Sequence, residues 1–131
     1  MSAEIIDGKQ VAELVRNRVR EDVEDWKAKG NRAPFLQVIL VGDDPASKVY
    51  TGAKTRACED VGIETYTEIL QDTISAKELK SVIEGYNTDD SVDGILVQLP
   101  LPSHLSSHDV IECINHRKDV DGFHPMNVGR L

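Results

Sequence analysis

The heptapeptide Phe35–Val41 (FLQVILV) limits the fold most strongly, because six of its seven residues are apolar. A continuous apolar run of this length is typical of a strand buried on both faces, as in parallel sheets with helices on each side. The segment Gly94–Gln98 (GILVQ) has the same character. The segment Ile63–Leu70 alternates apolar and polar residues, so we expect this strand to lie nearer an edge.

Helical patterns separate the predicted strands. Apolar residues recur every three or four positions between Gly8 and Lys29 and form one stripe, made of Val11, Leu14, Val15, Val19, Val23 and Trp26. Further helices are expected over 45–61, 76–86 and 107–114. We expect Asp44 and Ser75 to cap helices and Pro45 to occupy a first helical turn. Gly30 and Gly62 are expected to end helices. A short strand over 4–6 and a helix cap at Asp7 are also expected, with a polar loop from the last helix to Leu131.

Strands that alternate with helices of ten or more residues indicate an α/β fold. We therefore expect a three-layer domain, with a mostly parallel sheet flanked by helices, over residues 1–131. Parallel sheets bind ligands beyond the carboxyl ends of their strands. Three segments could line such a crevice: the turn after Val41, the turn after Val97 and the loop near Asp121.

The formal net charge of −8 argues against a general binder of nucleic acid or of anionic membranes. No apolar run approaches the length of a membrane-spanning helix, and the first ten residues do not form a secretory signal. Cys58 and Cys113 form neither a disulfide framework nor a CxxC metal motif. These features favour a cytoplasmic protein without a resident metal.

Tyr50 and Lys54 are four residues apart, so they share one face of the predicted helix, and Ser47 joins that face. One interpretation is an exposed polar surface. The other is a catalytic pair, because a lysine can transfer protons when its neighbours or burial lower its pKa.

Gln98 ends a predicted buried strand and precedes the stiff segment Leu99–Pro102 (LPLP). It is either a polar strand terminus or a ligand-binding group. An amide at that position can accept a hydrogen bond from an ammonium group and donate one to a substrate carbonyl.

The loop 118–125 (KDVDGFHP) contains Asp119 and Asp121 two residues apart. The sequence is compatible with an ordinary turn and fits a calcium loop poorly. A carboxylate such as Asp121 could also accept paired N–H groups from a planar heterocycle. His124 is a stronger candidate for a functional role than the other histidines, because it lies near Asp121. Asp43–Asp44 is interpreted as a turn and cap rather than a phosphoreceiver site.

Four segments together resemble the bifunctional methylenetetrahydrofolate dehydrogenase/methenyltetrahydrofolate cyclohydrolase family, in its bacterial form. They are Ile5–Lys9 (IIDGK), Val41–Ile63 (VGDDPASKVYTGAKTRACEDVGI), Asp93–Pro102 (DGILVQLPLP) and Lys118–Leu131 (KDVDGFHPMNVGRL). The resemblance implies that Lys54 is the catalytic lysine, Tyr50 its neighbouring tyrosine and Gln98 the glutamine that contacts the lysine. It also implies that Asp121 holds the pterin ring and that Val97 and Leu99 offer backbone contacts to folate.

The resemblance implies an enzyme that oxidises 5,10-methylenetetrahydrofolate with NADP and hydrates the product to 10-formyltetrahydrofolate. It also implies a homodimer when full length and a role in one-carbon metabolism and purine biosynthesis. The family's second, Rossmann-type NADP domain has no counterpart in these 131 residues. We therefore expect a catalytic-domain fragment without dehydrogenase activity of its own. A folate-binding or oligomerisation module that has lost activity is the alternative.

Overall fold

The computed structural model describes residues 8–122. In chain order the elements are α1 (Gly8–Ala28), β1 (Phe35–Val41), α2 (Pro45–Asp60), β2 (Glu64–Leu70), α3 (Ala76–Asn87), β3 (Gly94–Val97) and α4 (Ser107–Cys113). These bounds agree closely with the predicted elements. The strand expected over 4–6, the cap at Asp7 and His124 lie outside the described residues.

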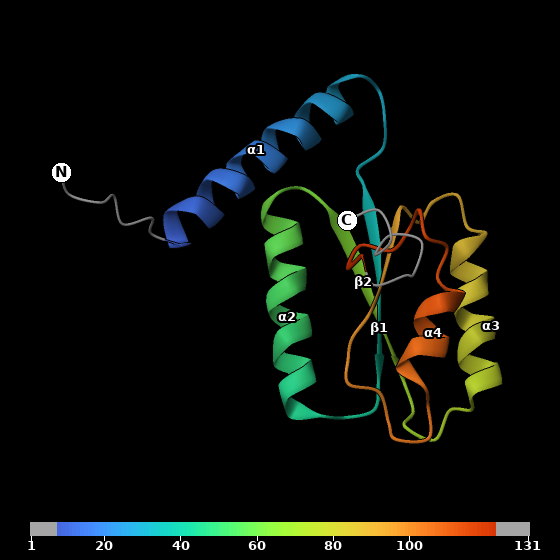
Figure 1. Ribbon diagram of the computed structural model, residues 1–131. Coiled ribbons are helices and arrows are strands. Elements are labelled where there is room, and N and C mark those ends of the chain that lie inside the picture. Colours follow the sequence, from blue (N-terminus) through green and yellow to red (C-terminus); the bar gives the residue numbers. More distant parts are fainter. Residues whose placement is uncertain (1–7, 123–131) are drawn as a thin grey trace.

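The three strands form a parallel sheet in the order β2-β1-β3. Within it, Val38 of the central strand pairs with Thr67 on one side and with Leu96 on the other. Helix α2 covers one face, while α3 and α4 cover the other (Figure 1). The predicted three-layer α/β fold is therefore confirmed, as is the edge position of the strand that follows Gly62.

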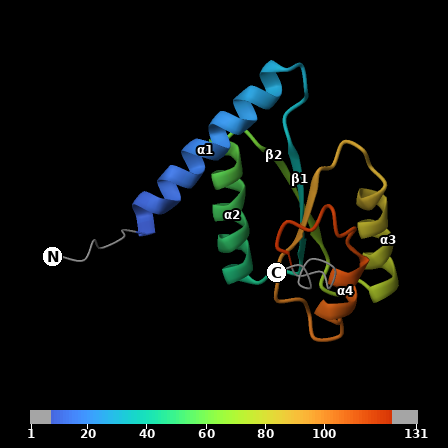
Figure 2. The same cartoon turned by 45° about the horizontal axis from the view of Figure 1, so that its top comes forward.

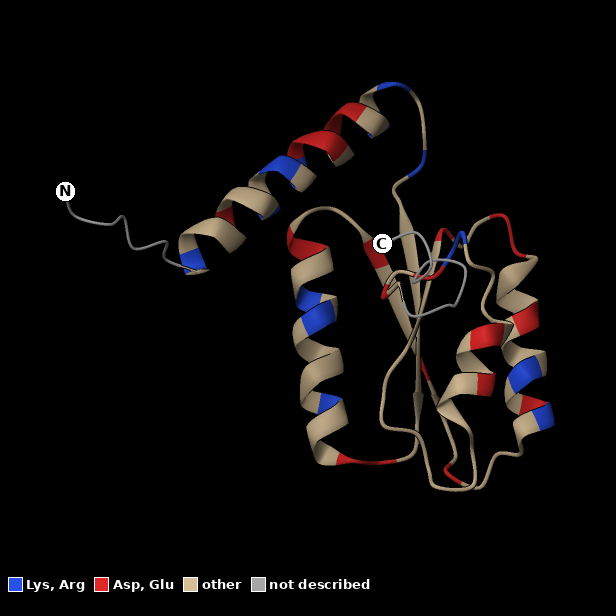
Figure 3. Ribbon diagram, viewed as in Figure 1, with Lys and Arg blue, Asp and Glu red and all other residues tan. Residues whose placement is uncertain are grey.

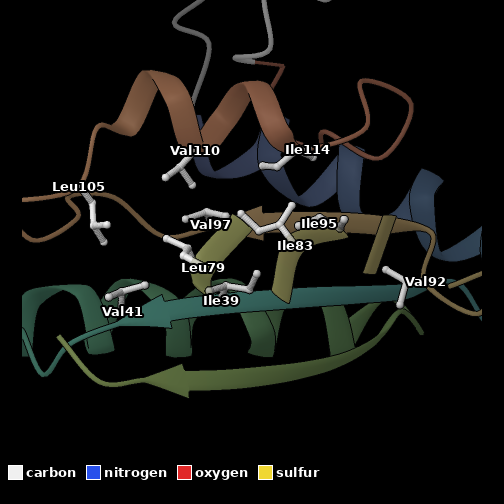
Figure 4. Close-up of a cluster of buried hydrophobic side chains, with 10 residues drawn as sticks. All are labelled: Ile39, Val41, Leu79, Ile83, Val92, Ile95, Val97, Leu105, Val110 and Ile114. Carbon is white, nitrogen blue, oxygen red and sulfur yellow. The ribbon is translucent and has the colours of Figure 1, made fainter. Parts of the chain in front are cut away.

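The central strand supplies both halves of the core, because its side chains alternate between the two faces. Ile39 and Val41 point toward α3 and α4, whereas Leu36 and Val38 lie on the side of α2. The larger cluster is drawn in Figure 4 and consists of Ile39, Val41, Leu79, Ile83, Val92, Ile95, Val97, Leu105, Val110 and Ile114. Burial on both faces explains why the sequence of β1 is apolar almost throughout.

The helix ends follow from local chemistry. The Asp44 carboxylate accepts a hydrogen bond from the Ser47 amide at 3.0 Å, and Ser75 caps α3 by accepting one from the Glu78 amide at 3.1 Å. Pro45 occupies the first turn of α2. After α1 and α2, the chain reverses at Gly30 (φ +89°) and Gly62 (φ +91°), in the left-handed region that favours glycine.

Helix α1 forms as predicted, but its apolar stripe does not pack against the domain. Of its residues only Val23 is buried, where it contacts the backbone at Gly62. Leu14 is 69% exposed, and Val11, Val15 and Trp26 are also exposed. The N-terminal half of α1 projects past α2 and away from the sheet (Figures 1 and 2). Periodicity identified the residues that share a face, but it could not show what covers that face.

Bonds from the C-terminal half of α1 hold the helix to the domain. Arg20 donates to the backbone carbonyl of Asp60 at 3.1 Å and to its carboxylate at 2.8 Å. The Trp26 indole donates to the carbonyl of Arg32 at 3.1 Å. None of the helices between residues 8 and 122 is both long and apolar enough to cross a membrane.

Candidate active site

A lysine on α2 and a glutamine just after β3 meet across the layers of the domain. Lys54 Nζ lies 3.2 Å from Gln98 Oε1, and Gln98 is only 6% exposed. The amide nitrogen of Gln98 donates to the carbonyl of Leu99 at 3.0 Å. Because this bond occupies the amide N–H, the amide oxygen is turned toward the lysine. The pair therefore holds the lysine nitrogen in a defined place.

The loop that carries Asp121 lies beside β3, which the sequence analysis did not predict. Asp119 forms a parallel bridge with Ile95, whose amide donates to the carbonyl of Lys118 at 2.7 Å. The Lys118 ammonium donates to the carbonyls of Tyr86 and Asp89, both at 2.9 Å. Asp121 follows this anchored segment directly, so its approach to β3 is set by backbone pairing.

Asp121 is exposed as a residue, but part of its carboxyl group lies against the protein. This partial burial raises the pKa of Asp121, the nearby Lys54 ammonium lowers it and Asp119 raises it. Burial prevails, because removing a carboxylate from water disfavours its charged form. The interaction with Lys54 places the two charged groups at one site.

A cavity of about 450 Å³ lies against α2 and the sheet and includes both charged groups in its lining. Its residues are mostly apolar: Pro34, Phe35, Leu36, Lys54, Ala57, Cys58, Ile63, Asp93, Gly94, Leu96, Val120 and Asp121. This volume falls within the range of small-molecule sites, which are commonly apolar with a few convergent polar groups. Of the three segments expected to line a crevice, only the loop near Asp121 lines this cavity. Its walls include Phe35 and Gly94, which begin β1 and β3, so the cavity does not lie beyond the carboxyl ends of the strands as expected. The apolar walls were not predicted.

The other predicted site residues occupy different environments. Tyr50 is 59% exposed, and among residues 8–122 no hydrogen bond joins it to Lys54 or Gln98. Val97 is buried in the cluster under α3 and α4, so only its backbone can serve the site. Leu99 is half-buried, and its carbonyl orients Gln98. The roles of these residues in binding remain predictions.

Ser47 departs from the expected exposed polar face, because it is buried. Its hydroxyl and that of Thr51, one turn further along α2, have no hydrogen-bond partner within the described part of the chain. Tyr50 is therefore exposed, as expected for a residue on a polar face, whereas Ser47 is not. One turn of helix can carry both environments, since α2 has one face on the sheet and one in solvent.

A bidentate ion pair joins Arg32 to Asp93, one of the residues that line the cavity. Arg32 donates to the two carboxylate oxygens of Asp93 at 2.6 and 3.1 Å, and the Phe35 amide donates to Asp93 at 2.8 Å. The Arg32 guanidinium, more than any other group, lowers the pKa of Asp93. Stability from this pair is therefore present above the unfolded-state pKa and is lost as the pH falls through the folded-state pKa. Because both side chains are about half exposed, solvent screens the pair, and it contributes little to stability.

The acidic turn after β1 acts as predicted, as a turn and cap. Asp44 caps α2, and Asp43 forms an ion pair with Lys48 that lowers the pKa of Asp43. Across residues 8–122 there is no group of three or more His, Cys, Asp or Glu side chains arranged to hold a metal ion.

Gly94 permits the loop to approach β3. A Cβ atom at this position would lie 2.6 Å from Val120 Cγ1 and 3.2 Å from Leu36 Cδ1. We expect Gly94→Ala to lower the free energy of unfolding by about 1–3 kcal/mol, because Val120 must shift and carry Asp121 with it. Urea unfolding measures this change.

The matched control for this substitution is Gly85→Ala in α3, where a Cβ would meet nothing within 4 Å. This variant should gain about 0.5–1 kcal/mol, since alanine is the better helix former. Equal unfolding midpoints for Gly94→Ala and the wild type would show that the loop does not depend on this close approach.

Known proteins resemble this chain in both fold and sequence. Residues 6–121 match the family model described as tetrahydrofolate dehydrogenase/cyclohydrolase, catalytic domain. A bifunctional methylenetetrahydrofolate dehydrogenase/cyclohydrolase from Campylobacter jejuni is 46% identical with a TM-score of 0.90, over 94% of this chain and 43% of that one. A 5,10-methylenetetrahydrofolate dehydrogenase from the silkworm Bombyx mori is 43% identical with a TM-score of 0.94, over 98% of this chain and 44% of that one.

A third structure is that of the dehydrogenase-cyclohydrolase from Trypanosoma brucei, complexed with NADP cofactor and inhibitor. It is 29% identical with a TM-score of 0.89, over 99% of this chain and 44% of that one. The present chain thus spans less than half the length of these structures. The family match covers both Lys54 and Gln98 and extends to Asp121. The chain belongs to the tetrahydrofolate dehydrogenase/cyclohydrolase family, whose catalytic domain it matches.

Proposed function

We propose that residues 1–131 form the folate-binding catalytic domain of an enzyme of one-carbon metabolism. This enzyme oxidises 5,10-methylenetetrahydrofolate with NADP and hydrates the methenyl product to 10-formyltetrahydrofolate. The observation that carries the proposal is the Lys54–Gln98 contact in the same site as Asp121. The named activities of the similar solved enzymes support it.

Hydration needs a group that accepts a proton from water. As water attacks the cationic amidine carbon, a C–O bond forms and a proton must leave the attacking oxygen. The neutral amine of Lys54 can accept this proton through Nζ. The neutral amine donates a hydrogen bond to Gln98 Oε1. This bond fixes the position of the nitrogen and leaves its lone pair available. The C–N bond to one ring nitrogen then breaks. Its electron pair stays on that nitrogen, which takes up the proton held by Lys54, and the hydroxyl releases its own proton to solvent and becomes the formyl carbonyl.

The described residues do not fit a dinucleotide cofactor. Pyrophosphate is commonly bound by a glycine-rich turn at a helix N-terminus. Here the turn after β1 leads into α2 through Asp43 and Asp44, whose carboxylates would repel phosphate. We therefore place NADP outside these residues and expect no dehydrogenase activity from them alone.

The test of the proposed function is a hydration assay on the purified chain. Loss of methenyltetrahydrofolate absorbance should proceed faster with the chain than in buffer alone. Folate binding without any acceleration would instead support the alternative, a binding module whose activity requires more of the enzyme. This alternative is supported by length, because the chain spans less than half of each of these solved relatives.

Asp121 is proposed to hold the pterin ring through paired hydrogen bonds. Asp121→Asn places an NH₂ donor where an acceptor is needed, at a cost of about 1.5–3 kcal/mol. Folate affinity should therefore fall roughly ten- to a hundredfold. Because partial burial raises the pKa of Asp121, ionisation of this carboxyl opposes folding, and the substitution should not destabilise the chain at neutral pH.

Calorimetric titration with a folate analogue measures the affinity of Asp121→Asn, with Asp119→Asn as the matched control. Asp119 lies two residues earlier and takes part in the bridge to Ile95 through its backbone. Its substitution should change affinity much less. Equal affinity in the wild type and Asp121→Asn would remove the proposed role.

We also propose a cytoplasmic location and a homodimeric full-length protein. The free thiols Cys58 and Cys113 support a reducing, cytoplasmic setting. The homodimer of the full-length protein and its part in purine biosynthesis rest on the family resemblance.

A further inference from the structure

The C-terminal end of α3 is tied to the segment of chain that leads to Asp121. Two side chains make this tie: Lys118 reaches from the segment to α3, and Asn87 reaches from α3 to the segment. We propose that Lys118 and Asn87 are positioning residues for folate binding, because they place the loop that carries Asp121. This inference rests on the proposed function, in which Asp121 holds the pterin ring.

Lys118 binds two backbone carbonyls where α3 ends. Its ammonium group donates to the carbonyl of Tyr86, in the last turn of the helix, and to that of Asp89, just beyond it, both at 2.9 Å. The basic residues 117–118 lie beside the acidic turn 89–90 that follows α3 (Figure 3). A cation is favourable here, because the last carbonyls of a helix lack intrahelical partners and carry partial negative charge.

The same bonds show that Lys118 serves the loop and not the ligand directly. An ammonium group has three N–H donors, and two of those on Lys118 are occupied by the carbonyls of α3 and its following turn. The lining of the cavity includes Lys54 and Asp121 but not Lys118. Any effect of Lys118 on folate must therefore pass through the segment that it holds.

Asn87 fixes the other end of this segment. Its amide nitrogen donates to the carbonyl of Cys113, the last residue of α4, at 2.7 Å. Its amide oxygen accepts a hydrogen bond from the Asn115 amide at 2.8 Å. The chain that leaves α4 is thus tied to α3 at both ends of the segment 113–118.

Backbone pairing passes the tie on to Asp121. The carbonyl of Lys118 accepts a hydrogen bond from the Ile95 amide of β3 at 2.7 Å. Asp121 follows three residues later and lines the cavity together with Lys54. A shift of the segment 118–121 would therefore move the carboxylate away from its place beside the lysine. Small misplacements of a recognition group can weaken binding strongly.

A double-mutant cycle on folate affinity tests whether Lys118 acts through Asp121. Lys118→Met retains the apolar stem but has no ammonium group, so calorimetric titration with a folate analogue should show about three- to tenfold weaker binding. In the Asp121→Asn background the same substitution should weaken binding less than about twofold, because the positioned group is already impaired. Equal factors in the two backgrounds would overturn the positioning role. So would unchanged affinity in Lys118→Met beside weak binding by Asp121→Asn, a result that leaves the proposed function intact.

The matched control is Arg117→Met, which removes the same charge from the preceding residue. Arg117 is exposed and makes none of the bonds of the tie. This variant should bind the folate analogue within about twofold of the wild type, as is usual for surface substitutions. Equal weakening by Arg117→Met and Lys118→Met would assign the effect to lost charge and would contradict the tie.

Amide hydrogen exchange reports the position of the segment without folate. In Lys118→Met the Ile95 amide, which donates to the Lys118 carbonyl, should exchange at least about tenfold faster than in the wild type. The Gln98 amide donates to the carbonyl of Ile39 in β1 at 2.9 Å and should keep its protection, which shows that the sheet is intact. Unchanged exchange at Ile95 would overturn the proposal.

Asn87→Ala removes the other half of the tie and provides a second cycle if Lys118→Met does not fold. Its binding should be about two- to fivefold weaker than that of the wild type, and this factor should also shrink in the Asp121→Asn background. An equal factor in both backgrounds would contradict the positioning role of Asn87. A wild-type chain that binds no folate analogue would overturn the proposed function and this inference together.

Discussion

Replacing Lys54 with methionine is expected to slow hydration of methenyltetrahydrofolate by about 10²–10⁴-fold, the usual worth of general acid–base catalysis. Methionine retains most of the apolar stem but has no titrating amine, so no group at the Gln98 oxygen can accept the proton. The hydration rate should be measured beside folate affinity and thermal stability. Stability should change little, because Lys54 is exposed on the cavity side of α2.

Lys54→Arg is the informative companion variant. Its guanidinium keeps a positive charge and can still donate to Gln98, but it does not release a proton near neutral pH. Hydration should therefore remain low in this variant. If Lys54→Met hydrates bound substrate at the wild-type rate and loses only affinity, Lys54 is a positioning residue and not the proton acceptor.

Leu79→Ala should lower the free energy of unfolding by about 2–5 kcal/mol, the largest effect on stability that we expect. Leu79 is 0% exposed and projects from α3 into the cluster that contains Ile39 and Val97 (Figure 4). The smaller side chain loses these contacts and leaves a cavity between α3 and the sheet. Such a loss is a large share of the stability of a domain of this size.

Urea denaturation of Leu79→Ala should be compared with that of Lys77→Ala. Lys77 lies two residues earlier in the same helix and is exposed, so its replacement by alanine should change stability by less than about 0.5 kcal/mol. A loss below about 1 kcal/mol for Leu79→Ala would indicate that the helix repacks and that the cluster is less tightly fixed than described.

The sheet and its helices were predictable because each has a local signal. The apolar run of β1 reflects burial on both faces, and Asp44, Ser75 and Gly62 mark helix ends through their own hydrogen bonds or backbone angles. The regular spacing of these signals was sufficient to predict the parallel, three-layer arrangement. Strand order could not be derived in this way, since it depends on pairing between distant segments.

The candidate site was only partly accessible from the sequence. Helical spacing identified the neighbourhood of Tyr50 and Lys54. The position of Gln98 after a strand indicated an amide that could bind a ligand, and the family resemblance implied its contact with the lysine. The approach of Asp121 depends on the bridge to Ile95 and on the missing side chain of Gly94, neither of which has a periodic pattern. The cover of α1 was equally inaccessible, because an apolar stripe does not specify its partner.

The strand order β2-β1-β3 implies a sequence of events during folding. Val38 pairs with Thr67, 29 residues later, and with Leu96, 58 residues later. Closing the shorter loop costs less chain entropy, so the β1–α2–β2 unit can assemble before β3 joins. Gln98 and the segment that places Asp121 both arrive with β3. Lys54 is thus carried on an early-forming unit, and it acquires its partners only when the last strand is added.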